Sequence, residues 1–273
     1  MSAYISFLKG EFNKIKKGGS NIFSGDEKII NPYNKSCTDP NKEIKVELLP
    51  QPICGNIRNA KIIICSLNPG LGDGDEDIED KSKAFVKGMP YLRNDILEQL
   101  NQDNPKNNFF WITDKAKGTS GYKYWVGKFN QKNEAASLIE KIKENYRNNG
   151  IVKSYQDIIK MLSESIATVE LIPYHSKIMT NDMQSKLLKC DSVRMLKEFM
   201  KDDIIPYLRE DQILCMMRSF ESWEITPDKY GTNKNIIFNP NPRNPSLNVN
   251  IKDFGQKILE HIGRITNDFT RGI

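Results

Sequence analysis

One buried-strand pattern, at residues 60–70, limits what this chain can fold into more than any other segment. It reads AKIIICSLNPG, a run of Ile and Cys without polar alternation that is closed by Pro-Gly. A strand that is apolar on both faces belongs inside a sheet covered on both sides, which is the usual position of a strand in a parallel sheet. The segment therefore predicts an α/β protein.

Further strand and helix patterns alternate along the chain. Strands are expected at residues 165–173, 211–219 and 234–239, with an additional candidate at 43–49. Helices are expected at residues 5–17, 90–100, 133–148, 154–163, 191–200, 202–210 and 251–262. Such alternation predicts a three-layer α/β/α fold around a central, mainly parallel four-stranded sheet.

The length and composition fit one domain with a real core. The chain has 273 residues, of which 38% are hydrophobic and 27% charged, so global disorder is not expected. We expect a single domain over residues 1–273, with residues 1–59 packed as an N-terminal extension on a core at 60–273. The formal net charge of +5 permits binding to nucleic acid without requiring it.

The cysteines and histidines do not suggest a metal site. Five Cys are scattered without a C-x-x-C pair, and only two His are present, so neither a metal nor another cofactor is expected. The chain has no apolar run of bilayer length, and its first residues lack the pattern of a signal peptide. We therefore expect a cytoplasmic protein with no membrane partner and no obligate protein partner.

Polar residues follow the expected strands at the positions where parallel α/β sheets bind ligands, beyond the strands' carboxyl ends. Asn68 follows the first strand, and Glu170 and His175 lie at the end of the second. Each has an ordinary alternative. Asn-Pro-Gly is turn chemistry in any protein, Glu170 could face outward or pair with a Lys, and a lone His is more often a hydrogen-bonded structural group.

The last expected strand ends in an unusual loop. Residues 235–247 read NIIFNPNPRNPSL, with X-Pro steps at Pro240, Pro242 and Pro245. Proline fixes φ and restricts the residue before it, so a rigid, extended loop is expected. Taken alone, the segment predicts no more than a stiff surface loop.

Taken together, SLNPG at residues 66–70 and NPNPRNPS at 239–246 resemble motifs one and two of the uracil-DNA glycosylase superfamily. The resemblance is closest to the single-strand-selective monofunctional branch and covers roughly residues 60–262. It implies that Asn68 positions the attacking water and that Asn239 takes the place of the family's catalytic His. It also places Arg243 in the loop that wedges into DNA.

Two departures from the family pattern bear on the substrate. Asn239 cannot become cationic, although its amide N–H group can still donate to a base that gains negative charge. Alignment of the family's middle-strand Leu-x-Pro with residues 171–173 places Glu170 where the family has a base-reading Asn. An ionised Glu only accepts hydrogen bonds, which suits the N4 amino group of a cytosine derivative. A two-residue shift of this alignment would remove the inference.

Neighbouring positions complete the expected site. The base is expected to contact Glu170, Pro69, Gly70, Tyr174, His175, Phe110 and Asp73. Phosphates and the DNA strand are expected to contact Asn241, Arg243, Asn244 and Ser246.

Two segments between the motifs bear on these contacts. In the aromatic and lysine-rich segment 107–128, one of Phe110 or Tyr122 is expected to stack on the base, while most of its aromatic residues are expected in the core. In the acidic loop 73–80, carboxylates such as Asp73 could bind hydroxyl groups of a decorated base. A plain solvated loop is the alternative there.

The expected activity is that of a monofunctional DNA glycosylase, which flips a modified base out of DNA and hydrolyses its N-glycosidic bond. The expected base is glucosylated 5-hydroxymethylcytosine of phage DNA, removed in bacterial antiviral defence, because Glu170 and the acidic loop both suit a decorated cytosine. Three alternatives stay open. They are a uracil glycosylase of base-excision repair, a non-catalytic nucleic-acid-binding protein of the same fold, and a chance match of two turn motifs.

Overall fold

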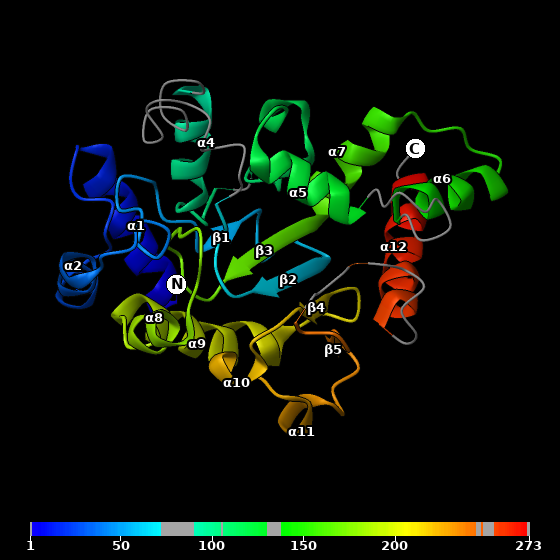
Figure 1. Cartoon of the computed structure of the whole chain (residues 1–273). Helices are drawn as coiled ribbons and strands as arrows, with labels where there is room; N and C mark the ends of the chain where they lie inside the picture. The colour runs from blue at the N-terminus through cyan, green and yellow to red at the C-terminus, as the bar shows by residue number, and fades with distance from the viewer. Residues whose placement is uncertain are drawn as a thin grey trace.

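The centre of the protein is a five-stranded sheet with the order β1-β3-β2-β4-β5 (Figure 1). The computed structural model describes residues 2–71, 90–104, 106–129, 138–243, 247 and 254–271. The strands are β1 (Ile53–Cys54), β2 (Ile62–Ser66), β3 (Ile166–Glu170), β4 (Ile213–Met216) and β5 (Ile236–Phe238). All four strands of the expected parallel sheet are present, so the predicted α/β class is confirmed.

The sheet differs from the expectation in one strand at its edge. β1 pairs with β3 in the antiparallel sense, which makes five strands rather than four. The additional candidate at residues 43–49 was wrong, because that segment forms turns. The reason lies in its hydrogen bonds: the backbone N–H and C=O of Ile44 bond to the side chain of Asn34 rather than to a neighbouring strand.

The register of the parallel strands brings their carboxyl ends to one edge. Ile62 of β2 pairs with Ile166 of β3, and four positions later Ser66 pairs with Glu170. On the other side of β2, Cys65 pairs with Met216, the last residue of β4. Residues that follow β2, β3 and β4 therefore emerge next to one another.

Helices cover both faces of the sheet. In Figure 1, α4, α5 and α7 lie on one side and α8, α9 and α10 on the other. The helices are α1 (Ala3–Lys16), α2 (Glu27–Ser36), α4 (Pro90–Gln99), α5 (Ser120–Phe129), α6 (Leu138–Asn148), α7 (Tyr155–Ser165), α8 (Asn181–Leu187), α9 (Asp191–Phe199), α10 (Phe220–Trp223), α11 (Pro227–Tyr230) and α12 (Phe254–Arg271). Short helical turns are η2 (Phe110–Ile112), η3 (Asp114–Ala116), η5 (Met200–Ile204) and η6 (Ile205–Tyr207).

Local sequence explains the start of one helix and the absence of another. Ser154 caps α7 in a reciprocal capping box with Asp157, which satisfies two backbone donors at the helix start. The helix expected at residues 202–210 was wrong: the chain forms the π-helical turn η5 and the 3₁₀ turn η6 instead. Pro206 lies inside this segment and has no backbone N–H to continue an α-helix.

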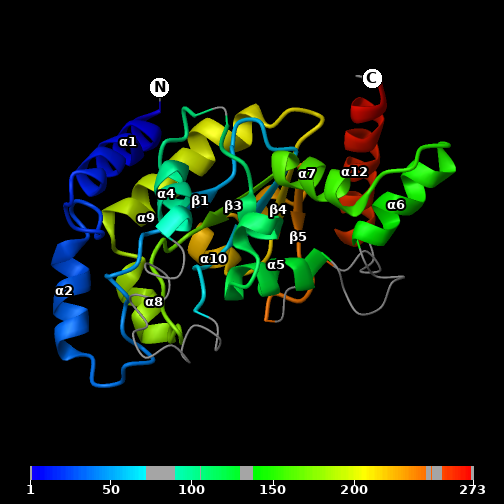
Figure 2. The same cartoon turned by 90° about the horizontal axis from the view of Figure 1, so that it is seen from above.

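The first sixty residues share the core of the sheet domain. The ring of Tyr4 on α1 lies 5.3 Å from that of Phe199 on α9, and Leu8, Phe23 and Ile30 are fully buried in the same cluster as the strands. Figure 2 shows α1 and α2 at one end of the molecule and α6 and α12 at the other. None of the helices in the described ranges combines the length and apolarity needed to cross a membrane.

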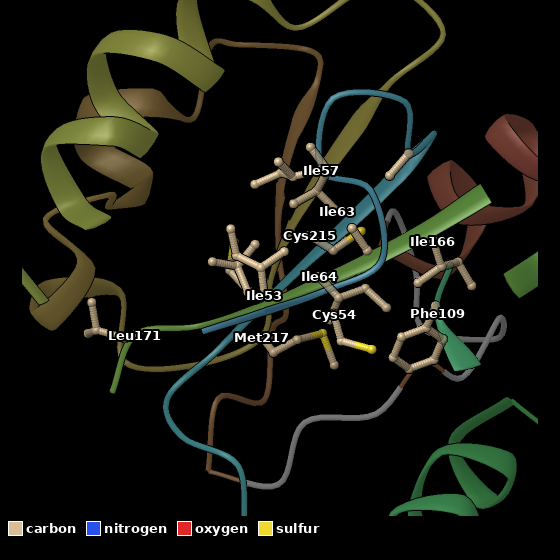
Figure 3. Close-up of a cluster of buried hydrophobic side chains, with 14 of the residues drawn as sticks. Ile53, Cys54, Ile57, Ile63, Ile64, Phe109, Ile166, Leu171, Cys215 and Met217 are labelled. Atoms are coloured by element: carbon tan, nitrogen blue, oxygen red, sulfur yellow. The ribbon is translucent and has the colours of Figure 1, made fainter. Parts of the chain in front are cut away.

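The apolar strand residues form the centre of this core. Figure 3 shows Cys54, Ile64 and Phe109 grouped beside the strands, and each of them is at most 4% exposed. The N–H of Phe109 donates to the carbonyl oxygen of Ser163, so the segment before η2 is tied to α7. This packing places η2 and α5 over one face of the sheet, next to the carboxyl ends of β2 and β3.

Candidate active site

A cavity of about 310 Å³ lies at the carboxyl ends of β2, β3 and β4. This volume is near the lower end of the ~300–1,000 Å³ typical of small-molecule pockets. Its lining includes residues from three strand ends and from the helices above the sheet. The position agrees with the general rule for ligand sites in parallel α/β sheets.

Strand alternation builds the floor of the cavity. Thr168 and Glu170 are two residues apart on β3, so their side chains point to the same face of the sheet. Cys54 of β1 pairs with Thr168, and Ser66 of β2 pairs with Glu170. All four residues line the cavity, which therefore has a floor of small side chains around one carboxyl group.

Glu170 is the most unusual group in the floor. Its side chain is only 8% exposed, and its Oε2 atom is buried without a hydrogen-bond partner in the described residues. Burial raises the pKa of Glu170 to about 8, although the positive charge of Arg218 acts in the opposite direction. At neutral pH the group is therefore mostly a neutral carboxylic acid.

Arg218 enters the cavity from the end of β4. It is partly buried, and within the described ranges it makes no ion pair with an acidic side chain. Its charge lowers the pKa of Glu170 and, together with burial, that of Lys128. The cavity thus contains one guanidinium group that is available to an anionic or hydrogen-bond-accepting ligand.

Asn68 stands in the turn after β2. It is 8% exposed, and its Nδ2 group donates only a long hydrogen bond of 3.3 Å to the carbonyl oxygen of Pro69. No described residue donates to its Oδ1 atom, so this oxygen can accept from a bound water. Pro69 and Gly70 also line the cavity, and no atom of the described residues lies within 4 Å of where a Cβ on Gly70 would be.

His175 is held as a neutral imidazole at the cavity wall. One ring nitrogen, Nε2, lies 3.1 Å from the Nε2 atom of Gln51, and the ring also hydrogen-bonds to backbone groups of Gly70 and Leu49. Burial is the main reason why the pKa of His175 falls to about 4. His175 therefore holds the loop around Gly70 in place and does not offer a general base with a pKa near 7.

Aromatic residues form the wall opposite the sheet. Trp111 of η2 and Trp125 of α5 are at most 9% exposed, whereas Tyr124 is 50% exposed beside them. Trp111 and α5 pack so closely that a Cβ on Gly121 would lie 2.6 Å from the Trp111 ring. The Nζ atom of Lys128 lies 5.1 Å from the ring centre of Tyr124. A flat ring in the cavity would thus meet aromatic faces and a cationic rim.

The structure brings five of the predicted site residues to this cavity. They are Asn68, Pro69, Gly70, Glu170 and His175.

Three residues predicted as base contacts lie elsewhere. Tyr174 is absent from the cavity lining because its hydroxyl group bonds to Asp26 and to the N–H of Phe23. Phe110 is 2% exposed and packs against Trp111, so the indole lines the cavity in its place. Tyr122 lies in a separate groove with Tyr155.

The second motif lies apart from the cavity. Asn239 is 1% exposed and is not among the lining residues, since β4 separates β5 from β2. Its N–H donates to Met216, and its Oδ1 accepts from the N–H of Asn241 at 3.0 Å. Asn241 and Arg243 are exposed. The predicted residues Asp73, Asn244 and Ser246, and the acidic loop 73–80, lie outside the described residues.

Sequence reasoning missed Arg218, Trp111 and Tyr124. Arg218 had a detectable signal, because a charged residue directly after an apolar strand is the same pattern that identified Glu170. The aromatic pair had none, since which rings of segment 107–128 face the sheet depends on the packing of η2 and α5.

The described residues offer no metal site, because no three of their His, Cys, Asp and Glu side chains are grouped. Comparison of the chain with protein-family models, with curated proteins and with solved structures found no match in any of the three. The function is therefore argued from the cavity and from the two sequence motifs.

Proposed function

We propose that this protein is a monofunctional DNA glycosylase with the fold of the uracil-DNA glycosylase superfamily. The observation that carries the proposal is a base-sized cavity, with Asn68 at its edge and a buried carboxyl group in its floor. The cavity lies at the strand end that bears the motif SLNPG. A nucleobase flipped from DNA would stack against Trp111 and place its polar edge beside Glu170.

Asn68 suits the role of positioning a water. Its carboxamide oxygen accepts no hydrogen bond from the described residues, and an amide is too weak a base to remove a proton. In this mechanism the water held by Asn68 attacks C1′ of the sugar, the bond between C1′ and the base breaks, and the base leaves with the bonding electrons. The protein then accelerates the reaction mainly by positioning the water and the base and by electrostatic stabilisation.

Arg218 and Lys128 suit the DNA strand around the flipped nucleotide. Both cations lie near the half-exposed Tyr124, and the chain carries a formal net charge of +5. Positive groups at the rim of a cavity favour phosphate oxygens. Arg243, exposed after β5, supplies a further cation for the strand in this proposal.

The base that we propose is a decorated cytosine, with glucosylated 5-hydroxymethylcytosine of phage DNA as the specific candidate. Glu170 offers a hydrogen-bonding carboxyl group to the base edge. The space beside Gly70, which no described residue fills, gives a substituent on the base a route out of the cavity. Excision of such a base would serve antiviral defence in a bacterium.

A panel of DNA substrates tests the proposal. Oligonucleotides with uracil, cytosine, 5-hydroxymethylcytosine or its glucosylated form would be incubated with the protein, in single and double strands. Abasic sites are then detected by alkaline cleavage. We expect abasic sites to form fastest at the glucosylated base and more slowly at unmodified cytosine. For Asn68→Ala we expect a loss of at least about 100-fold in rate with DNA affinity retained.

The control variant is Asn148→Ala, at an exposed position of α6. Abasic sites in the uracil substrate alone would assign the protein to base-excision repair instead. DNA binding without abasic sites on any substrate, in wild type and Asn68→Ala alike, would make it a non-catalytic binder.

A further inference from the structure

Glu170 has a position that suits a role in the chemical step as well as contact with the base edge. It is the last residue of β3 and lies between β1 and β2 in the sheet, so its carboxyl group enters the cavity from the floor. Its Oε2 atom is buried and has no partner among the described residues. An unsatisfied polar atom in the interior costs about 1–3 kcal/mol, which a ligand that bonds to it would recover.

The groups around Glu170 do not stabilise its ionised form enough to keep it charged at neutral pH. Arg218, after β4, is the cation whose field reaches it, but the two side chains form no ion pair within the described part of the chain. Tyr124 of α5 lines the same cavity, and burial together with the charge of Glu170 raises the pKa of Tyr124. Among the described residues, Cys54, Cys65 and His175 are further titratable groups near this floor, and all three are neutral at physiological pH. The charged Asp95 acts on Cys54 and is not among the groups that shift Glu170.

A neutral carboxyl group presents one O–H donor and one carbonyl acceptor side by side. The Watson–Crick edge of an aminopyrimidine offers the complement, with a ring nitrogen, N3, that accepts and an exocyclic amino group that donates. In uracil N3 carries a hydrogen and cannot accept. A proton could then go only to a carbonyl oxygen, which is a much weaker base.

We infer that Glu170 is an acid catalyst that passes its proton to N3 of an aminopyrimidine base as the glycosidic bond breaks. This inference rests on the proposed function. The electron pair of the C1′–N1 bond moves onto the base, the O–H proton of Glu170 moves to N3, and the base leaves as a neutral molecule. The attacking water gives up one proton after it bonds to C1′, and that proton restores the acid.

The role assigned here differs from ionised recognition of the N4 amino group. An ionised Glu170 would accept from the amino group but could not neutralise the leaving base. The neutral acid does both, so it couples selection of the base to the chemical step. Specificity for a cytosine-type base then appears in the rate of bond cleavage more than in affinity for DNA.

Glu170→Gln separates the two roles, because glutamine keeps a donor and an acceptor but has no proton to give. The measurement is single-turnover release of the cytosine-type base between pH 6 and 9.5. For wild type we expect the rate to fall about tenfold per pH unit above a pH of about 8. For Glu170→Gln we expect a roughly 10²–10⁴-fold lower rate without this fall, and unchanged DNA affinity. Glu164→Gln, at an exposed position of α7, is the matched control.

A second measurement needs no variant. 5-Fluorocytosine is a better leaving base than cytosine, so it depends less on protonation. In wild type, we expect the ratio of the 5-fluorocytosine rate to the cytosine rate to widen as pH rises above 8.

Two failures remain distinguishable. If wild type releases no base from any DNA, the proposed function fails and this inference fails with it. If wild type releases base but Glu170→Gln keeps both the rate and the pH profile, with a constant 5-fluorocytosine ratio, only the acid role fails.

Discussion

The hydroxyl group of Tyr174 donates a 2.6 Å hydrogen bond to Asp26 and accepts one of 3.0 Å from the backbone N–H of Phe23. The two side chains are 148 positions apart in the sequence. Ser192 also bonds to the Asp26 carboxylate through its hydroxyl and its N–H. One buried carboxylate thus joins the N-terminal segment, the exit of β3 and the start of α9.

Tyr174→Phe should destabilise the protein without changing base release. The variant leaves Asp26 and the Phe23 N–H short of a partner in the interior, which costs about 1–3 kcal/mol. Urea unfolding measures the loss, and Tyr207→Phe, at a position 74% exposed, is the control. Equal stability of the two variants would show that the Asp26 cluster contributes nothing to the fold.

Glu170→Gln should stabilise the protein at high pH. The folded-state pKa of Glu170 is about 8, above the ordinary value of 4.5. The contribution of this group to the free energy of unfolding is therefore fully present below pH 4.5 and is lost as pH rises through 8. Glutamine removes this dependence, and we expect a gain of roughly 1–3 kcal/mol at pH 9 and none at pH 4. A pH series of unfolding curves with Glu164→Gln as reference checks it; a pH-independent difference would contradict the buried neutral acid.

His175→Gln should have the opposite pH signature. The pKa of His175 is about 4 in the folded protein, below the ordinary 6.5. The unfolded chain therefore binds the proton first, and stability is lost as pH falls from 6.5 towards 4. We expect wild type to lose roughly 1–3 kcal/mol more than the variant over this range. Glu170→Gln retains this acid dependence and serves as the comparison.

Gly70→Phe should block a large base and leave the fold intact. Gly70 lines the cavity, and a Cβ there would meet no atom of the described residues within 4 Å. We expect an unchanged melting temperature and a fall of at least about tenfold in release of the glucosylated base, with a smaller effect on unmodified cytosine. Gly10→Phe, at an exposed position with equal space on α1, is the control. Equal losses on both bases would contradict a route beside Gly70.

The sequence was most informative about features that depend on residues close together in the chain. An apolar run that ends in a polar residue predicted both β2 with Asn68 and β3 with Glu170, because burial and the turn that follows depend on neighbouring residues. The carboxylate's protonation state was not predictable: it depends on β1, on α5 and on the distance to Arg218, which long-range packing determines. The separation of Asn239 from the cavity follows from the order of the strands in the sheet, which cannot be read from one motif.

The antiparallel edge strand β1 affects the order in which the protein can fold during its synthesis. Its partner β3 begins more than a hundred residues later in the chain, and Gly55 just after β1 accepts no side chain, because a Cβ there would lie 2.4 Å from the carbonyl oxygen of Ile166. During synthesis, β1 in the N-terminal sixty residues can therefore pair at this edge of the sheet only after β3 has been made. Arg218 emerges later still, so the lining of the cavity is complete only after most of the polypeptide has been made.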